Sequence, residues 1–282
     1  MLKRAAILCL VMGCMLAATD CDAQRAPSRF TLESKVIGAT YTIEVVVPEG
    51  VAAAGKKLPA IYCADWFIVA DYLKSLPRLM NMGPLTEPYI MVGISAGTTM
   101  VEWATARTRD FTPDSPVDSY SKENTFAPAL KLAGGGARFI TFLKDELVPR
   151  VEADYPADPT RRAFAGYSLG GLLATQLLAR EPKLFQYYLV GSPSLWHNEY
   201  RLAAEFEKTP EDLLRSIRKI YLSVGEEESW EMLKGYGLLR DALQHKGLTG
   251  SRIKAEIIPE AGHVGAIPIA LYNGLRFLFD RD

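Results

Sequence analysis

Residues 164–171 read Phe-Ala-Gly-Tyr-Ser-Leu-Gly-Gly, so an apolar run reaches a serine between glycines and then enters a helical pattern. Gly166 and Gly170 stand two positions before and after Ser168, where the backbone of a sharp strand-to-helix turn is crowded. The short GxSxG match alone also arises by chance, but its place at a strand-to-helix junction favours a nucleophile elbow. Such a turn raises the hydroxyl clear of a sheet and directs the first amide of the next helix to the same point. The motif therefore predicts Ser168 as the nucleophile of an acyl-transfer reaction.

Short apolar runs alternate with helical patterns along most of the chain. Residues 30–36 and 41–47 alternate polar and apolar side chains around Gly38, which predicts an antiparallel hairpin. Runs typical of buried parallel strands occupy residues 58–63, 89–94, 162–165, 185–190, 220–224 and 253–258, and helical patterns occupy residues 139–151, 169–180, 232–245 and 267–279. The alternation predicts an α/β fold with a mostly parallel central sheet, the antiparallel N-terminal hairpin and helices on both faces. Active-site groups are then expected on loops beyond the carboxyl ends of the strands.

One segment breaks this alternation. Residues 96–133 are rich in Thr, Ser, Asp, Pro and Gly and show no sustained period. The segment is longer than an ordinary connection, so we expect a long ordered loop that shapes a binding site.

The length and charge of the chain limit what it can be. The chain has 282 residues and a formal net charge of −1, with no block of like charges, which gives no reason to expect a nucleic-acid partner. No internal repeat or linker separates a second domain, so we expect one domain over residues 24–282.

The N-terminus resembles an export signal. Lys3 and Arg4 precede an apolar stretch at residues 5–18, which is shorter than the roughly 20 residues of a membrane span. Small residues before Gln24 predict a signal peptide over residues 1–23 and a soluble exported protein, periplasmic or extracellular. The alternative is a lipobox at residues 11–14, with lipid anchoring through Cys14.

Cysteine usage agrees with an exported protein that lacks disulfides. Three of the 4 cysteines, Cys9, Cys14 and Cys21, fall in or beside this leader. The mature chain keeps only Cys63, so no internal disulfide can form and stability must come from the core. A buried apolar role for Cys63 is favoured over a nucleophilic one.

A serine nucleophile needs a base within hydrogen-bond reach, and the chain has 3 histidines. His263 follows the last predicted strand and precedes the last helix, where the base of a Ser, acid, His order belongs. His245 lies near a helix end, where a solvated role is expected. His197 lies in another strand-end loop and is an alternative pocket residue.

The orienting acid is expected after the strand at residues 220–224. Glu226, Glu227 and Glu228 follow it in succession, and neighbouring loop residues point in different directions. We choose Glu228 to orient His263 and stabilise the imidazolium, with Glu226 as the next choice. The alternative is that these carboxylates only cap the following helix.

Two amides are expected to bind the oxyanion. The backbone N–H of Leu169 is the first, and the loop after the strand at residues 58–63 should supply the second, from Trp66 or Phe67. Trp66 is equally a candidate for core or pocket wall.

Together these residues resemble the esterase D and enterochelin esterase branch of the α/β-hydrolases, from about residue 30 to the C-terminus. The marks are residues 58–62 leading to Asp65, Thr-Arg-Asp-Phe-Thr-Pro at 108–113, three glycines at 134–136 before a helix ending at 152–155, the elbow, and Ser-Pro-Ser-Leu-Trp at 192–196. The resemblance implies an α/β-hydrolase fold and cleavage of carboxylic esters, including siderophore trilactones, acylated sugars and thioesters, without metal or organic cofactors. Some relatives transfer acyl groups, and some siderophore esterases resemble a Ser-His dyad.

Three further residues are assigned to substrate binding: Tyr167 beside the serine, Trp196, and Arg109 in the long segment. Arg109 could bind an anionic or catecholate substrate through its planar guanidinium, although an ion pair with Asp110 is an alternative. Where many relatives carry Gly after Asp65, this chain has Trp66 and Phe67, which we expect to add bulk beside the oxyanion loop and narrow the acyl pocket.

The sequence thus predicts a secreted serine esterase that acts on small-molecule esters through an acyl-enzyme. Siderophore or acyl-sugar hydrolysis and acyl transfer are narrower alternatives for the same site. A non-catalytic binding protein with this fold is an alternative from another class.

Overall fold

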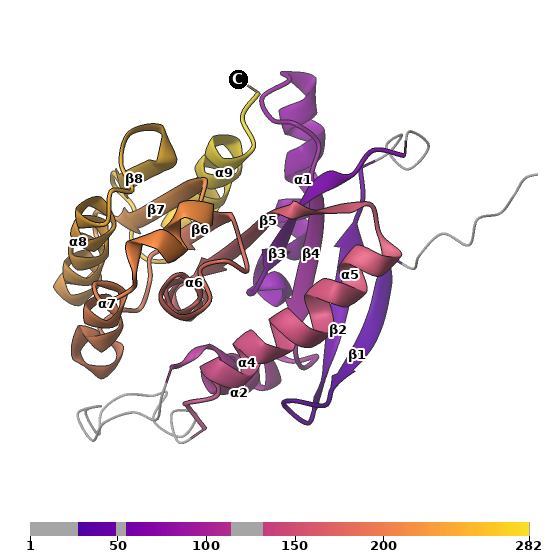
Figure 1. Ribbon diagram of the computed structural model, residues 1–282, viewed down its shortest axis with the longest axis horizontal. Helices are drawn as coiled ribbons and strands as arrows, with labels where there is room; N and C mark the ends of the chain where they lie inside the picture. Colours follow the sequence, from indigo (N-terminus) through magenta and orange to yellow (C-terminus); the bar gives the residue numbers. More distant parts are fainter. Residues whose placement is uncertain (1–27, 49–54, 114–131, 282) are drawn as a thin grey trace, which may run out of the picture.

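The computed structural model describes residues 28–48, 55–113 and 132–281. Within them, eight strands form one twisted sheet with the order β1-β2-β4-β3-β5-β6-β7-β8, as Figure 1 shows. The strands are β1 (Arg29–Ser34), β2 (Ala39–Val46), β3 (Leu58–Cys63), β4 (Ile90–Ser95), β5 (Ala157–Tyr167), β6 (Tyr187–Gly191), β7 (Lys219–Gly225) and β8 (Ile253–Ile258).

The two sides of the sheet differ in strand direction as the sequence predicts. β1 pairs antiparallel with β2, and β2 pairs antiparallel with β4. All pairings from β4 through β3 and on to β8 are parallel. The hairpin strand β2 buries every second side chain, Tyr41, Ile43 and Val45, whereas every residue of β3 is buried because helices cover both faces there. The predicted α/β-hydrolase architecture is confirmed.

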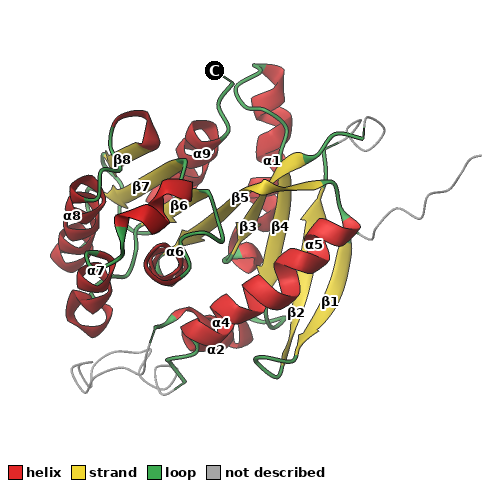
Figure 2. Ribbon diagram, in the orientation of Figure 1, coloured by secondary structure: helices red, strands yellow, loops and turns green. Residues whose placement is uncertain are grey.

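Helices cover both faces of the sheet (Figure 2). The apolar faces of α1 and α9 form one core cluster with one side of the sheet, and the residues of α4, α5, α6 and α8 form a second cluster with the other side. The helices are α1 (Trp66–Met82), α2 (Met100–Phe111), α4 (Gly136–Phe142), α5 (Val148–Asp154), α6 (Leu169–Arg180), α7 (Arg201–Phe206), α8 (Trp230–His245) and α9 (Ala266–Leu278), and a π-helical turn η2 (Leu143–Leu147) joins α4 to α5.

Helices α1 and α2 differ from the sequence-based expectation. α1 contains Pro77, which obscures a helical pattern, although the ring is tolerated in the structure. α2 occupies part of the segment expected to be a loop, and a capping box between Thr99 and Glu102 starts it. Residues 114–131 of that segment lie outside the described residues, as does the predicted signal peptide at residues 1–23.

The parallel strands bring distant parts of the chain to one edge of the sheet. β5, β6, β7 and β8 lie side by side and run in the same direction, so the segments after their carboxyl ends are neighbours.

Cys63, at the end of β3, is buried, and burial raises the pKa of its thiol to about 12. No helix in the described part of the chain is long and apolar enough to cross a bilayer.

Candidate active site

Ser168 lies at the turn between β5 and α6 and has a strained backbone. Its φ of 60° and ψ of −115° lie in a region that L-residues rarely occupy, a conformation that costs on the order of 1–3 kcal/mol. The Ser168 N–H donates to the carbonyl of Gly191 at 2.9 Å. Gly166 permits the tight return of the chain, because a Cβ there would lie 2.1 Å from the carbonyl oxygen of Gly170. The predicted elbow geometry is therefore present.

An imidazole and a carboxylate meet beside the elbow. His263, in the turn after β8, places Nδ1 2.5 Å from Oε2 of Glu228, which follows β7. The Glu228 side chain is only 1% exposed, whereas the His263 side chain is 41% exposed. The carboxylate is thus shielded from water, and the imidazole remains open to the cavity described below.

Glu228 is held as an anion by its partners. Burial by itself would raise its pKa, but hydrogen bonds from His263, Ser192 and the backbone N–H of Gly225 outweigh burial and hold the pKa below its ordinary value. Oε1 accepts from Ser192 Oγ at 2.6 Å and from Gly225 N at 2.9 Å. An ionised Glu228 can fix the orientation of the imidazole and stabilise its protonated form.

The two neighbouring glutamates point elsewhere. Glu226 accepts the backbone N–H of Glu260 at 3.0 Å and is exposed. Glu227 lies on the wall of the cavity without a contact to His263 in the described residues. Of the three candidate carboxylates, Glu228 is the one that the fold brings to the histidine.

Ser168 and His263 line the same cavity of about 650 Å³. The Ser168 hydroxyl lies 3.3 Å from Oγ of Ser194 and makes no hydrogen bond to the imidazole within the described residues. Most of the wall is apolar or aromatic, and the lining residues are Ile68, Trp103, Ala104, Arg107, Thr108, Tyr167, Ser168, Leu169, Ser194, Trp196, Glu227, Glu228, Ser229, Met232, His263, Val264 and Ile267. Ser168 and His263 thus face one space that is large enough for a small-molecule ester.

Tyr167 and Trp196 both line this cavity, as predicted for substrate-contacting residues. The Tyr167 hydroxyl also donates to the backbone carbonyl of His263 at 2.7 Å and lies 2.7 Å from Ser192 Oγ. Burial raises the pKa of this phenol, so it stays protonated. Trp196 directs Nε1 at the sulfur of Met232 at 3.1 Å. Tyr167 therefore supports the histidine loop in addition to forming the wall.

Ser192 and Ser194 are site residues that no sequence motif assigns to a role. Ser192 contacts Glu228 and Tyr167, and Ser194 contacts Ser168. The only signal for them was the Ser-Pro-Ser string, which marks the family but does not show where each hydroxyl points.

The two candidate oxyanion donors both begin helices. Leu169 is the first residue of α6 and Trp66 the first residue of α1, and the N–H groups of a first helical turn have no intrahelical acceptor. Leu169 directly follows Ser168, and Trp66 follows Asp65, whose carboxylate accepts the N–H of Tyr167, so both amides are candidates to bind an anion.

The expectation that Trp66 narrows the acyl pocket is wrong. Its side chain is buried in the α1 and α9 core, where Nε1 donates to Glu44 at 2.8 Å. The indole packs so closely over β4 that a Cβ on Gly93 would lie 2.0 Å from it. Phe67 stacks on Trp103 with ring centroids 6.0 Å apart. Trp66 therefore fills the core and Phe67 supports one wall of the cavity, because the start of α1 turns the Trp66 indole away from the cavity.

Arg109 does not line the cavity. Its Nε lies 2.7 Å from Asp110 Oδ1, and one of its Nη atoms donates to the hydroxyl of Tyr41. The ion-pair alternative is the one that the structure contains, because the helical spacing of α2 turns Arg109 towards β2 and Arg107 towards the cavity. His197 is buried and does not line the cavity, and His245 pairs at the surface with Glu207.

The described residues contain no group of three or more His, Cys, Asp or Glu placed to hold a metal ion. Among the polar groups that line the cavity are the hydroxyl of Ser168, the imidazole of His263 and the carboxylate of Glu228, which contacts the imidazole. Chemically, such a set can move a proton from Ser168 to His263 and stabilise an oxyanion. With the sheet order and the elbow, these features define an α/β-hydrolase.

Comparison with known proteins agrees. The family model described as "Putative esterase" matches residues 34–235. The chain therefore belongs to this esterase family, and its class of reaction is carboxylic ester hydrolysis. The family resemblance and the enzyme class predicted from the sequence are confirmed.

Individual relatives share much of the chain. It is 29% identical over 238 residues to the ferri-bacillibactin esterase BesA of Bacillus subtilis, covering 79% of this chain and 80% of that protein. It is 31% identical over 176 residues to a siderophore enterobactin esterase of Emericella nidulans, covering 58% and 57% of the two chains. The crystal structure of the BES protein from Bacillus cereus superposes with a TM-score of 0.77 at 22% identity, covering 100% of this chain and 99% of that one, and shows the shared fold.

Proposed function

We propose that the protein is a serine esterase in which Ser168 is the nucleophile, His263 the general base and Glu228 the residue that orients His263. The observation that carries the proposal is the contact of 2.5 Å between His263 and a buried Glu228, beside a cavity that Ser168 also lines. The hydroxyl lies against Ser194, so its side chain would rotate towards His263 before reaction.

The proposed reaction has two halves. Ser168 Oγ attacks the ester carbonyl carbon while Nε2 of His263 takes its proton, and the oxyanion forms beside the amides of Leu169 and Trp66. Collapse breaks the bond to the alcohol, which leaves with the proton from His263. A water molecule then attacks the acyl-enzyme with His263 again as base, and the acid is released as Ser168 recovers its proton.

Turnover of p-nitrophenyl acetate and butyrate tests this proposal. We expect Ser168→Ala and His263→Ala each to reduce kcat by roughly 10³-fold or more, because either change removes nucleophile activation. A fluorophosphonate probe should label the wild type at Ser168. Glu226→Gln, at a carboxylate that does not line the cavity and binds the backbone of Glu260, should keep both turnover and labelling. Full activity in Ser168→Ala, or the absence of labelling in the wild type, would contradict the proposal and favour a non-catalytic binding protein.

We propose siderophore esters as the narrower substrate class. The support is that two relatives, BesA and the Emericella nidulans protein, are named for siderophore ester hydrolysis. The largely apolar and aromatic wall of the cavity suits aromatic acyl arms. Purified protein should hydrolyse catecholate trilactones with a kcat/KM well above that for simple alkyl esters. An equal or higher kcat/KM for acylated sugars would favour the acyl-sugar alternative, and transfer to added alcohols would favour acyl transfer.

We also propose that residues 1–23 direct export and are removed before Gln24. The basic start and short apolar stretch support this interpretation. Mass spectrometry of the N-terminus of exported protein tests it. A mature chain that begins with a lipid-modified Cys14 would instead support membrane anchoring.

A further inference from the structure

The ladder between β3 and β5 ends just before the nucleophile. The last parallel backbone bond on this side joins the N–H of Ala64 to the carbonyl of Ala165 at 3.0 Å. β3 ends at Cys63 and the chain turns into α1, whereas β5 continues to Tyr167. The backbone groups of Tyr167 on this side therefore need partners other than a strand.

An ion pair of two side chains supplies these partners. The N–H of Tyr167 donates to Oδ2 of Asp65 at 3.2 Å, and Nη2 of Arg107 donates to the carbonyl of Tyr167 at 2.8 Å. Nε of Arg107 donates to Oδ1 of Asp65 at 2.6 Å. Asp65 and Arg107 thus satisfy both backbone polar groups of the residue before the nucleophile and also bind each other.

These contacts hold the strained peptide on both sides. The carbonyl of Tyr167 and the N–H of Ser168 belong to the same peptide group, which Arg107 binds on one side and the carbonyl of Gly191 on the other. Asp65 also precedes the first residue of α1, Trp66, whose amide is the second candidate oxyanion donor. The same pair therefore connects the nucleophile elbow to the oxyanion loop.

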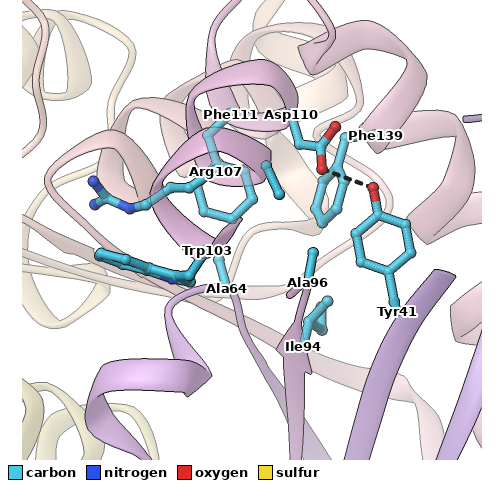
Figure 3. A pocket seen from close by; sticks show the side chains of 10 residues that line it. Tyr41, Ala64, Ile94, Ala96, Trp103, Arg107, Asp110, Phe111 and Phe139 are labelled. Atoms are coloured by element: carbon cyan, nitrogen blue, oxygen red, sulfur yellow. Dashed lines mark hydrogen bonds between the residues drawn. The ribbon is translucent and has the colours of Figure 1, made fainter. Parts of the chain in front are cut away.

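Both side chains of the pair are shielded from water, and Arg107 comes from helix α2. The Asp65 side chain is 4% exposed and the Arg107 side chain 14% exposed, so water competes little for these bonds. Figure 3 shows that α2 directs Asp110 to Tyr41 on one side, while the guanidinium of Arg107 extends to the other side. The Arg107 guanidinium lies 5.1 Å from the ring centre of Trp103, which restricts its orientation.

We propose that Asp65 and Arg107 are positioning residues for catalysis, and we call this pair the elbow clamp. The clamp keeps the nucleophile and the oxyanion amides at a fixed separation by tying α2, the start of α1 and the end of β5 together. Arg107 lines the cavity, but its role is to hold the elbow and not to bind an anionic substrate. The inference rests on the proposed serine esterase function.

Steady-state kinetics of Arg107→Gln tests the clamp. Since small displacements of reacting groups cost up to roughly 10²-fold in rate, we expect kcat to fall about 10- to 100-fold with KM changed less than about threefold. The rate of fluorophosphonate labelling and the affinity for a boronic acid, which forms a tetrahedral adduct, should fall by similar factors. Arg107→Lys keeps the charge but not the planar fork, so its kcat should lie between those of Arg107→Gln and the wild type.

A matched control lies two residues away on the same helix. Arg109 forms a comparable ion pair with Asp110, whose side chain is 3% exposed, but does not line the cavity. Arg109→Gln should lower the melting temperature and leave kcat and the labelling rate unchanged. A purely structural role for Arg107 would make the two variants alike in kcat once both are folded.

Three kinetic results would overturn the clamp. The first is a folded Arg107→Gln variant with wild-type kcat. The second is a loss confined to KM for anionic esters, which would make Arg107 a substrate-binding residue. The third is wild-type kcat in a folded Asp65→Asn variant, which replaces Arg107→Gln if Arg107→Gln does not fold. In Asp65→Asn the side-chain amide oxygen can still accept from the Tyr167 N–H, while the negative charge is lost.

Hydrogen exchange separates the clamp from the proposed function. If the wild type hydrolyses no ester, the proposed function fails, but the clamp still predicts faster exchange of the Tyr167 amide in Arg107→Gln than in Arg109→Gln. Equal exchange in both variants would show that the ion pair does not hold the elbow, whatever the enzyme hydrolyses.

Discussion

Three adjacent glutamates in one loop have different roles because of their contacts. Glu226 binds a backbone amide at the surface, Glu227 lies on the cavity wall, and Glu228 is buried against His263. Burial without partners would favour a neutral carboxyl group, but three hydrogen bonds keep Glu228 ionised at neutral pH. Local contacts, more than residue type, thus decide which carboxylate can serve the imidazole.

At this scale we predict that Glu228→Gln lowers kcat by roughly 10²- to 10⁴-fold with little change in KM. The amide can donate to Nδ1 and so favour the wrong tautomer of the imidazole, and it cannot stabilise the imidazolium. Ester hydrolysis at saturating substrate measures the effect.

Glu226→Gln is the control, because its carboxylate binds the backbone of Glu260 and not His263. It should retain wild-type kcat. Full activity in Glu228→Gln would indicate a Ser-His dyad, in which the acid only supports the loop.

The elbow depends on glycines where elements approach one another closely. Gly170, in the first turn of α6, lies against Asp65, and a Cβ there would be 2.3 Å from Oδ2. Gly237, inside α8, offers open space instead, since a Cβ there would have no described atom outside its own helix backbone within 4 Å. The same residue type is thus required in one helix and replaceable in the other.

We therefore predict opposite effects of alanine at the two positions. Gly170→Ala should displace Asp65, lower the free energy of unfolding by roughly 1–3 kcal/mol and reduce kcat. Gly237→Ala should raise the free energy of unfolding by up to about 1 kcal/mol and leave kcat unchanged, because alanine favours the helix. Urea unfolding monitored by circular dichroism measures both. A stable and fully active Gly170→Ala variant would show that the contact with Asp65 is not needed.

For the whole molecule, the order of the strands assembles the site. Ser168, Glu228 and His263 follow β5, β7 and β8, and Ser192 follows β6 between them. Because β5 to β8 are parallel neighbours, their carboxyl ends present these residues together.

The tertiary structure also lowers the pKa of carboxylates outside the site, such as Glu205, through hydrogen bonds and basic neighbours.

Because the pKa values of several carboxyl groups are lower in the folded state, the free energy of unfolding falls as the solution becomes more acidic. Folded Glu44, Glu205 and Glu228 bind a proton less tightly than in the unfolded chain, where the glutamate pKa is about 4.3. Their stabilising contribution is present above that pH and is lost as the pH falls through the folded values, because the unfolded state then binds more protons. We expect the urea midpoint to fall as the pH drops below about 4.3.

Salt and substitution provide the controls for this pH dependence. Added salt should reduce the part due to Glu44 and Glu205, which are partly exposed, and should leave most of the part due to buried Glu228. Glu228→Gln should make the acid slope shallower. A urea midpoint that rises as the pH falls would contradict the lowered pKa values of these glutamates.

Local patterns predicted much of the fold. The helix at residues 169–180 and the strand at residues 253–258 have the predicted bounds, because their apolar periods are clear. Helix α2 was missed, since its threonines and charged residues conceal the period and the Thr99 capping box is a weak signal. Arg109 and Arg107 could not be told apart because the helix that separates their directions was not predicted.

The sequence by itself determined the elbow at Ser168, the α/β alternation and the position of His263 after the last strand, since each follows from short-range spacing. Only the tertiary structure decided that Glu228 reaches His263, that Trp66 turns into the core and that Asp65 pairs with Arg107 at the elbow. These outcomes depend on side-chain directions and on contacts between residues far apart in sequence, 42 positions for the pair at the elbow. Packing of the whole chain sets such directions, and no local pattern encodes them.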